Sequence, residues 1–265
     1  MDLPRLLRSP FRRPPPDTDR AFAEWLVGEV GQAMLADQQA LLEDILVRMV
    51  GYHALQCSVG EAQPLLEGCR IRRRHYLTRS AGAGATLQAD PASLPMANHS
   101  LDLVLLHHSL DFEDNPHEVL REATRALIPG GTLVVVGFNP FSLWGLARLM
   151  RLGSGRLPWL ARFLPALRVH DWFGVLGLEL EGYESAHYSL PLAESGRRRS
   201  AWLARLGARL WPRRGAFYIL VARKRAAMIR PQRPRFALPE RSPQVIPVPL
   251  AHWQRRHRPD QEPEH

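Results

Sequence analysis

The chain has 265 residues, of which 45% are hydrophobic, and its formal net charge is +9. This length allows one domain with a sizeable core, and two cysteines, Cys57 and Cys69, exclude a disulfide framework. No apolar run approaches the roughly 20 residues that cross a bilayer, which argues against a transmembrane segment. Because a cleavable signal sequence is not apparent either, we expect a cytoplasmic protein.

The first third of the chain predicts a helix followed by three short strands. Residues 1–20 are basic and rich in proline, and we expect them to be flexible. Apolar residues recur at helical spacing through residues 21–50, although glycines interrupt the pattern. Short runs bounded by turn residues then predict strands at 52–57, 72–78 and 85–90.

The clearest pattern lies in the centre of the chain. "LDLVLL" (101–106) and "TLVVVGF" (132–138) are continuous apolar runs, as expected of strands covered on both faces. The helix between them is marked at its start by Asn115 as a cap, by Pro116 in the first turn and by Glu118 at the capping-box position. Strand, helix and strand joined this closely form a βαβ unit with parallel strands.

The second half predicts amphipathic helices in an insert over residues 141–172, with late strands at 175–189 and 217–224. The fold class is therefore α/β: an open, mostly parallel sheet with helices on both faces, and a helical insert after the fifth strand. The predicted limits are a flexible N-terminus at 1–20, a domain at 21–230 with its core at 50–140, and a disordered proline- and arginine-rich tail at 231–265.

Positive charge gathers in this second half. Residues 195–215 contain a series of arginines and no acidic residue, and the C-terminal segments are also basic. Such segments attract nucleic acid or acidic surfaces, although a solvated, disordered tail is the more common origin of such a composition. Aromatic residues suited to stacking on bases are sparse in the tail, which favours the second interpretation.

One stretch of the chain resembles a known family. The segment that runs from "LQAD" (87–90) to "GFNP" (137–140) is similar to the central half of class I S-adenosylmethionine-dependent methyltransferases of the type-11 kind. In that family an aspartate ends the third strand, and an "LPF" segment, an "FDLV" strand and an "LxExxRVLKPGG" helix follow. The counterparts here are Asp90, "LPM" (94–96), "LDLV" (101–104) and "LREATRALIPGG" (120–131).

The resemblance implies S-adenosylmethionine as the cofactor and assigns residues to its adenine end. Asp90, with the adjacent Ala89, would accept a hydrogen bond from the adenine amino group. A structural alternative carries equal weight, because an aspartate before Pro91 is also a common turn residue.

The resemblance also assigns residues to the reacting end. His107 would line the methionine and methyl part of the pocket, and His108 and Asp111 would border the acceptor. A histidine would then act as the base for an oxygen or nitrogen acceptor, with Asp111 as its helper. Adjacent residues of an extended chain point to opposite faces, so at most one histidine should face the ligand, and simple packing is the alternative for each.

The loop after the first strand departs from the family pattern. The family carries D/E-x-G-x-G-x-G there, where backbone N–H groups approach the cofactor's methionine. In "QCSVGEA" (56–62), Gln56 holds the acidic position, Ser58 and Ala62 replace two glycines, and Gly60 alone is retained. Gln56 is still able to accept a hydrogen bond from the cofactor's ammonium group, and the small side chains leave room for the backbone to approach.

The acid that grips the ribose in the family is also missing. "HYLTRSAGAG" (75–84) offers only Thr78 and Ser80, beside Arg79. Each lost charged hydrogen bond is worth roughly 1.5–3 kcal/mol, so we expect weakened cofactor binding.

Two functions follow from these patterns. The first is methyl transfer to an unidentified acceptor; the second is an inactive methyltransferase-fold binding protein that contacts nucleic acid or an acidic partner through its basic surface. Cys57, Cys69 and His75 lack zinc-ligand spacing, so no metal is expected. The insert, with its tryptophans and arginines, suits a lid, a membrane-surface contact or a wall for a lipid-like acceptor.

Overall fold

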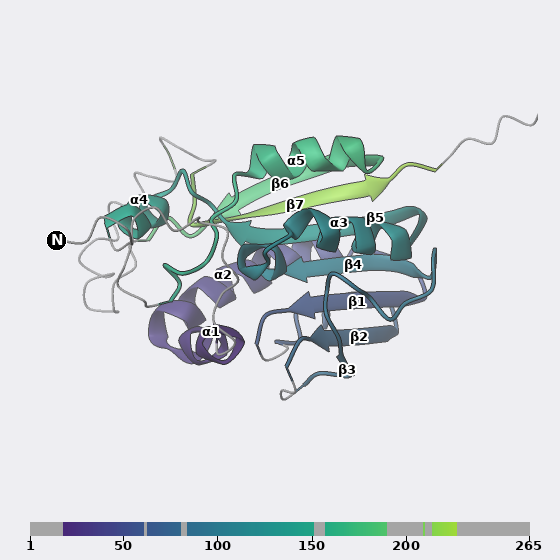
Figure 1. Cartoon of the computed structure of the whole chain (residues 1–265), viewed down its shortest axis with the longest axis horizontal. Helices are drawn as coiled ribbons and strands as arrows, with labels where there is room; N and C mark the ends of the chain where they lie inside the picture. Colours follow the sequence, from purple (N-terminus) through teal and green to yellow (C-terminus); the bar gives the residue numbers. More distant parts are fainter. Residues whose placement is uncertain are drawn as a thin grey trace, which may run out of the picture. The chain divides into compact units, whose positions relative to one another are not determined.

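The computed structural model of the chain describes residues 18–60, 63–80, 84–150, 157–189, 209 and 214–226. These residues form a seven-stranded sheet in the order β3-β2-β1-β4-β5-β7-β6 (Figure 1). The strands are β1 His53–Ser58, β2 Arg73–Thr78, β3 Leu87–Gln88, β4 Leu101–His107, β5 Leu127–Phe138, β6 Leu178–Ala186 and β7 Phe217–Lys224. β1 to β5 pair in parallel and β7 is antiparallel to both β5 and β6, which confirms the open, mostly parallel sheet.

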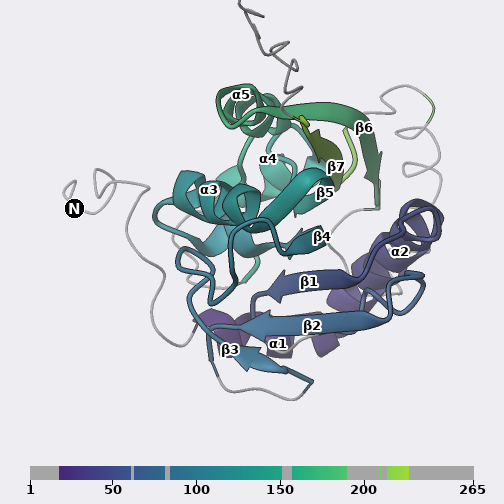
Figure 2. The ribbon, with the colours of Figure 1, turned by 90° about the vertical axis from the view of Figure 1, so that its right-hand side faces the viewer.

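Helices cover both faces of this sheet. They are α1 Thr18–Val27, α2 Glu29–Leu46, α3 Pro116–Ala126, α4 Leu143–Met150 and α5 Ala166–Val175. Figure 2 shows α3 and α5 on one side of the sheet and α1 and α2 on the other. Successive residues of β4 accordingly enter different cores: Leu105 packs with the α1–α2 side and Val104 with the α3–α5 side. This two-sided burial explains why the run 101–106 is apolar at nearly every position.

The strand order reverses between β1 and β4. From β1 the chain builds outward through β2 to β3, whereas β4 returns to the other side of β1 and continues to β5. Ligands of open α/β sheets bind beyond the carboxyl ends of the strands at such a reversal. The topology therefore places the ends of β1 and β4 at the candidate site.

The N-terminal region forms two helices where the periodicity predicted one over 21–50. α1 ends at Val27, Gly28 is extended with φ −66° and ψ 158°, and α2 begins at Glu29. A Cβ on Gly31 would lie 2.3 Å from the Trp25 carbonyl oxygen. The missing side chain at Gly31 lets α2 start directly against α1, so the glycines mark a sharp helix–helix corner.

The start of α3 is partly as predicted. Pro116 is the first helical residue and Asn115 is the residue before it, but the Asn115 side chain makes no capping hydrogen bond. The Glu118 N–H donates instead to the Asn115 backbone carbonyl at 2.9 Å. The predicted capping box is therefore wrong, because the backbone of Asn115 takes the place of its side chain. Within the described ranges, no helix combines the length and apolarity needed to cross a membrane.

Candidate functional site

The ends of four parallel strands lie side by side at one edge of the sheet. Ser58, the last residue of β1, is in register with Thr78 of β2 and with His107 of β4. Beyond β3, the Ala89 N–H donates to the Thr78 carbonyl at 3.1 Å. The predicted site residues after β1, β3 and β4 belong to three separate segments of the sequence. The fold brings these three segments together along one edge of the sheet.

Gln56 shapes the loop after β1. Its buried side-chain Nε2 donates to Ser58 Oγ at 2.8 Å and to the Gln63 carbonyl at 2.5 Å, and its Oε1 accepts from the Leu65 N–H at 3.1 Å. A carboxylate at this position would be unable to make the two donated bonds. The Gln56 amide therefore has a structural role at the position where the family has an acid, because it joins the residues after β1 to the end of β1.

The retained glycine of this loop lies against α1. Gly60 has φ +75°, a left-handed conformation in which a side chain is unfavourable. A Cβ there would stand 2.5 Å from the Asp19 carbonyl oxygen and 2.9 Å from the Ala23 Cβ. Both the backbone conformation and the lack of space beside α1 therefore require a glycine at position 60. Helix α1 covers this turn.

Arg79 gathers acids from three other segments around it. Its Nη2 hydrogen bonds to the Glu113 carboxylate and lies 3.7 Å from Asp90 Oδ1, and its Nη1 lies 4.0 Å from Asp19 Oδ1. Ser80 Oγ also donates to Asp19 Oδ2 at 3.3 Å. Arg79 lies in the segment where the family carries the acid that binds the ribose. Its guanidinium links α1, the end of β3 and the segment before α3. This role was not predicted from the sequence.

Asp90 makes a local turn and keeps its carboxylate half-exposed. Its Oδ1 accepts from the Ala92 N–H at 2.9 Å, and its carbonyl accepts from the Ser93 N–H at 2.9 Å. Half of the side-chain surface, 50%, remains accessible to solvent. Asp90 is therefore able to stabilise the turn and still present a carboxylate oxygen to solvent as a hydrogen-bond acceptor.

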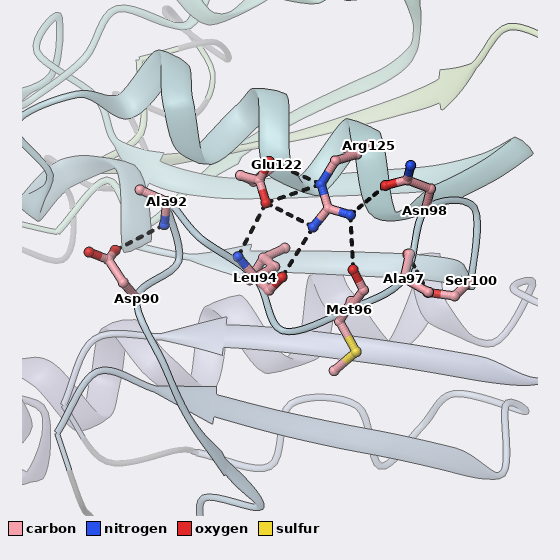
Figure 3. A network of polar contacts seen from close by, with 9 residues as sticks. All are labelled: Asp90, Ala92, Leu94, Met96, Ala97, Asn98, Ser100, Glu122 and Arg125. Atoms are coloured by element: carbon pink, nitrogen blue, oxygen red, sulfur yellow. Dashed lines mark hydrogen bonds and ion pairs between the residues drawn. The ribbon is translucent and has the colours of Figure 1, made fainter.

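The segment after Asp90 is fastened to α3 by Glu122 and Arg125 (Figure 3). Arg125 donates from Nη1 to the Met96 carbonyl at 2.9 Å and from Nη2 to the Leu94 carbonyl at 3.1 Å. Glu122 pairs with Arg125 at 2.8 Å and accepts from the Leu94 N–H at 3.3 Å. The Glu-x-x-Arg of the "LREATR" motif thus has a positioning role, because it fixes the path between Asp90 and β4.

A buried polar chain follows β4. His108 Nδ1 lies 2.8 Å from Asp111 Oδ2, and His108 Nε2 lies 2.9 Å from Gln38 Nε2 of α2. Gln38 Oε1 in turn lies 3.0 Å from His107 Nε2. The consistent assignment has the Gln38 amide donating to His108, His108 donating to Asp111, and His107 donating to Gln38. Gln38 is a partner that the sequence analysis missed.

The prediction that the two histidine rings point to opposite faces is wrong. His108 has φ +55°, in the left-handed region, so the alternation of an extended strand ends at His107. Both rings consequently contact Gln38, with their centroids 4.8 Å apart. All four members of the chain are buried in the structure.

Burial sets the charge state of this chain. It lowers the pKa of His108 to about 3, and burial together with the neighbouring His108 lowers the pKa of His107. Burial raises the pKa of Asp111, partly opposed by the Phe138 N–H, which donates to Asp111 Oδ2 at 3.1 Å, and by Arg148. The His108–Asp111 contact is therefore a hydrogen bond from a neutral imidazole and not an ion pair.

These lowered values predict an acid-sensitive fold. Both histidines stay neutral in the native state, whereas the unfolded chain binds protons at them below pH about 6.5. The contribution of the two histidines to the free energy of unfolding should thus fall as the pH drops from 7 toward 4, by up to about 1.4 kcal/mol per pH unit for each histidine, while the raised pKa of Asp111 acts in the opposite direction. Urea unfolding at a series of pH values gives the free energy of unfolding as a function of pH. For His107→Gln this free energy should change less steeply with pH than for wild type, and for the exposed His170→Gln it should change as in wild type. Equal slopes in all three proteins would contradict this assignment.

The open sheet, with its reversal between β1 and β4, is the fold of the class I methyltransferases. The family model described as "Methyltransferase domain" matches residues 68–135. Over 179 residues the chain is 36% identical to the protein YafS of Escherichia coli K12, across 67% of this chain and 70% of that protein. The chain belongs to the class I S-adenosylmethionine-dependent methyltransferases.

More distant relatives agree with this family. The chain is 32% identical over 123 residues to the ubiquinone/menaquinone biosynthesis C-methyltransferase UbiE of Roseobacter denitrificans, and the match covers 45% of this chain and 47% of that enzyme. It thus spans about half the length of this relative. In fold, it is similar to a methyltransferase of Thermotoga maritima described as a possible histamine N-methyltransferase, with a TM-score of 0.53 and 19% identity over 78% of this chain and 97% of that one.

Proposed function

We propose that S-adenosylmethionine binds across the carboxyl ends of β1, β3 and β4, beneath α1, and that its methyl group is transferred to an apolar, lipid-like acceptor. Two observations carry this proposal: Ser58 of β1 lies beside His107 of β4, and Thr78 of β2, on the other side of Ser58, is bonded to Ala89 after β3. The half-exposed carboxylate of Asp90 fits the cofactor as the structure stands, whereas the tight turn at Gly60 is filled by α1 and would fit it only after α1 moves.

Each end of the cofactor has proposed contacts. Asp90, beside Ala89, accepts from the adenine amino group, while Gln56, Ser58 and Gly60 border the methionine part. The cofactor supplies a methyl group on a positively charged sulfur, which an acceptor displaces in one step. The chain's part is to orient the two reactants and to exclude water.

His107, His108 and Asp111 are proposed to handle the acceptor's proton as a unit. Asp111 orients His108, and Gln38 joins His108 to His107, whose Nε2 is the donor to Gln38. Both rings are covered by α2 in this structure. The proposal therefore requires α1 and α2 to draw back from the strand ends when the acceptor binds.

An apolar acceptor suits the surroundings of these strand ends. Phe22 of α1 lies within 5.5 Å of the His108 ring and 4.8 Å of the Phe112 ring, and Phe138 lies 4.3 Å from His108, all measured between centroids. Aromatic walls bind apolar molecules and exclude water. The name of the UbiE relatives refers to ubiquinone and menaquinone biosynthesis, and by extension from those enzymes an apolar acceptor is proposed for this chain.

Two further expectations remain predictions. Residues 195–215 lie almost entirely outside the described residues, as does the tail from residue 227, so the contact with nucleic acid or an acidic surface stays a hypothesis. We infer a cytoplasmic location from the two cysteines, Cys57 and Cys69, which are free and buried.

Calorimetric titration with S-adenosylhomocysteine tests the cofactor site. Wild type should bind saturably, and Asp90→Ala should bind at least tenfold more weakly because an acceptor for adenine is lost, a difference of about 1.4 kcal/mol. Asp171→Ala, an exposed aspartate on α5, is the matched control and should bind as wild type does. Absence of heat at millimolar ligand, or equal binding by both variants, would contradict the placement.

A further inference from the structure

A buried carboxylate from α1 lies at the end of β2. Asp19 is in the first turn of α1, is only 7% exposed, and accepts from Ser80 Oγ at its Oδ2 across 3.3 Å. Ser80 follows β2, which ends at Thr78. Aspartate is almost never this buried unless its carboxylate has a partner. Asp19 thus brings a carboxylate to a strand end where residues 78–80 carry no acid of their own.

Asp19 also lies beside the turn after β1. A Cβ on Gly60 would stand 2.5 Å from the Asp19 backbone carbonyl oxygen. Because β1 and β2 are neighbours, with Ser58 in register with Thr78, the Asp19 residue borders the ends of both strands. In nucleotide-binding sheets of this kind, an acid that follows the second strand binds the ribose hydroxyls. Asp19 therefore places its carboxylate where that acid is expected to act.

The contacts of Arg79 leave an acceptor atom on Asp19. Arg79 Nη2 hydrogen bonds to the Glu113 carboxylate, whereas Arg79 Nη1 lies 4.0 Å from Asp19 Oδ1. A separation of 4.0 Å is beyond hydrogen-bonding distance. Asp19 Oδ1 accordingly keeps its capacity to accept from a hydroxyl group, and the two oxygens of a carboxylate suit a pair of neighbouring hydroxyls. Glu113 is the weaker candidate, because its carboxylate is already bonded to Arg79.

We propose that Asp19 supplies the carboxylate that binds the ribose hydroxyls of S-adenosylmethionine, in place of the acid that the family carries after β2. This inference rests on the proposed function, because it requires the cofactor at the ends of β1, β3 and β4. Helix α1 has to move from Gly60 for the cofactor to enter, and its return brings Asp19 onto the bound ribose. The binding carboxylate thus comes from a residue 61 positions away from Ser80 in the sequence.

Two ligands that differ in a single hydroxyl group test this assignment. Calorimetric titration of the full chain compares S-adenosylhomocysteine with its 2′-deoxyadenosyl analogue. Wild type should bind the analogue about tenfold more weakly, because a hydrogen bond to a charged group is lost. Asp19→Ala should bind S-adenosylhomocysteine about tenfold more weakly than wild type does. It should also bind the two ligands within about twofold of each other, because the carboxylate that distinguishes them is gone.

Glu24→Ala is the matched control for this experiment. Glu24 is an exposed acid of the same helix and pairs with Arg20 at 3.1 Å. This variant should keep both the wild-type affinity and the wild-type preference for the ribose. Thermal unfolding followed by circular dichroism ensures that both variants are folded when they are compared.

The possible failures are distinguishable from one another. Wild type that binds neither ligand contradicts the cofactor site itself, and the assignment of Asp19 falls with it. Wild type that binds both ligands equally, or an Asp19→Ala variant that keeps the full preference for the ribose, overturns the assignment alone. Tighter binding of S-adenosylhomocysteine by Asp19→Ala also overturns it, because Asp19 would then hold α1 against the cofactor.

Discussion

Replacing Asp111 with alanine should lower the free energy of unfolding by about 2–6 kcal/mol, because two buried donors would each lose an acceptor at a cost of roughly 1–3 kcal/mol. Asp111 Oδ2 accepts from His108 Nδ1 at 2.8 Å and from the Phe138 N–H at 3.1 Å, and all three groups are inaccessible to solvent. Alanine would leave both donors buried without an acceptor. The loss should appear directly as a lower urea midpoint with an unchanged slope.

Two other variants make this prediction specific. Asp111→Asn should cost less than alanine, because an amide oxygen at the Oδ2 position still accepts from both His108 Nδ1 and the Phe138 N–H. Asp114→Ala removes a nearby, partly exposed acid that lies 3.9 Å from Arg162, and should cost less than about 1 kcal/mol. If Asp111→Ala stays within 1 kcal/mol of wild type, the buried chain does not stabilise the fold.

Phe22→Ala should destabilise the protein by about 3–5 kcal/mol, as expected for a large aromatic side chain removed from a core. The Phe22 ring is fully buried and contacts the rings of Trp25, Phe112 and Phe138 in addition to His108. These contacts hold α1 over the strand ends, so the cavity would loosen α1 in particular. Val27→Ala, at an exposed position of the same helix, should be nearly neutral.

Unfolding in urea and hydrogen exchange together test the Phe22 prediction. Phe22→Ala should lower the unfolding free energy and speed the exchange of the α1 amides, 18–27, more than that of β4. An α1 that exchanges as slowly as in wild type would mean that Phe22 does not anchor the helix. In that event the cover over Gly60 depends on Asp19 and its contacts with Arg79 and Ser80.

Much of the fold was predictable because β4 and β5 are covered on both faces. Their continuous apolar runs, with Pro116 at the start of α3 and Pro-Gly-Gly near the start of β5, specify a βαβ unit from local sequence alone. A reversal in strand order is expected of such sheets, but the identity of the strands that flank it, β1 and β4, appears only in the structure. The strands and the residues at their ends were therefore predictable from the sequence.

The hydrogen-bond and ion-pair partners of the site residues were not predictable, because these contacts join segments that lie far apart in the sequence. Gln38 meets His108 across 70 residues, and Asp19 meets Arg79 through packing of α1 that no local pattern encodes. The left-handed turn at His108 was equally hidden, since histidine does not mark such a turn as glycine does. Glu122 and Arg125 stood in the quoted motif, but their role appears only when the loop after Asp90 is seen folded over α3.

We place the cofactor at the ends of β1, β3 and β4. Hydrogen exchange of wild type, measured with and without saturating S-adenosylhomocysteine, tests this placement. We predict that exchange slows at residues 57–60, 88–92 and 107–111 and stays unchanged at the far ends of the same strands. Slowing elsewhere in the chain, with these three segments unaffected, would show that the cofactor binds at another place.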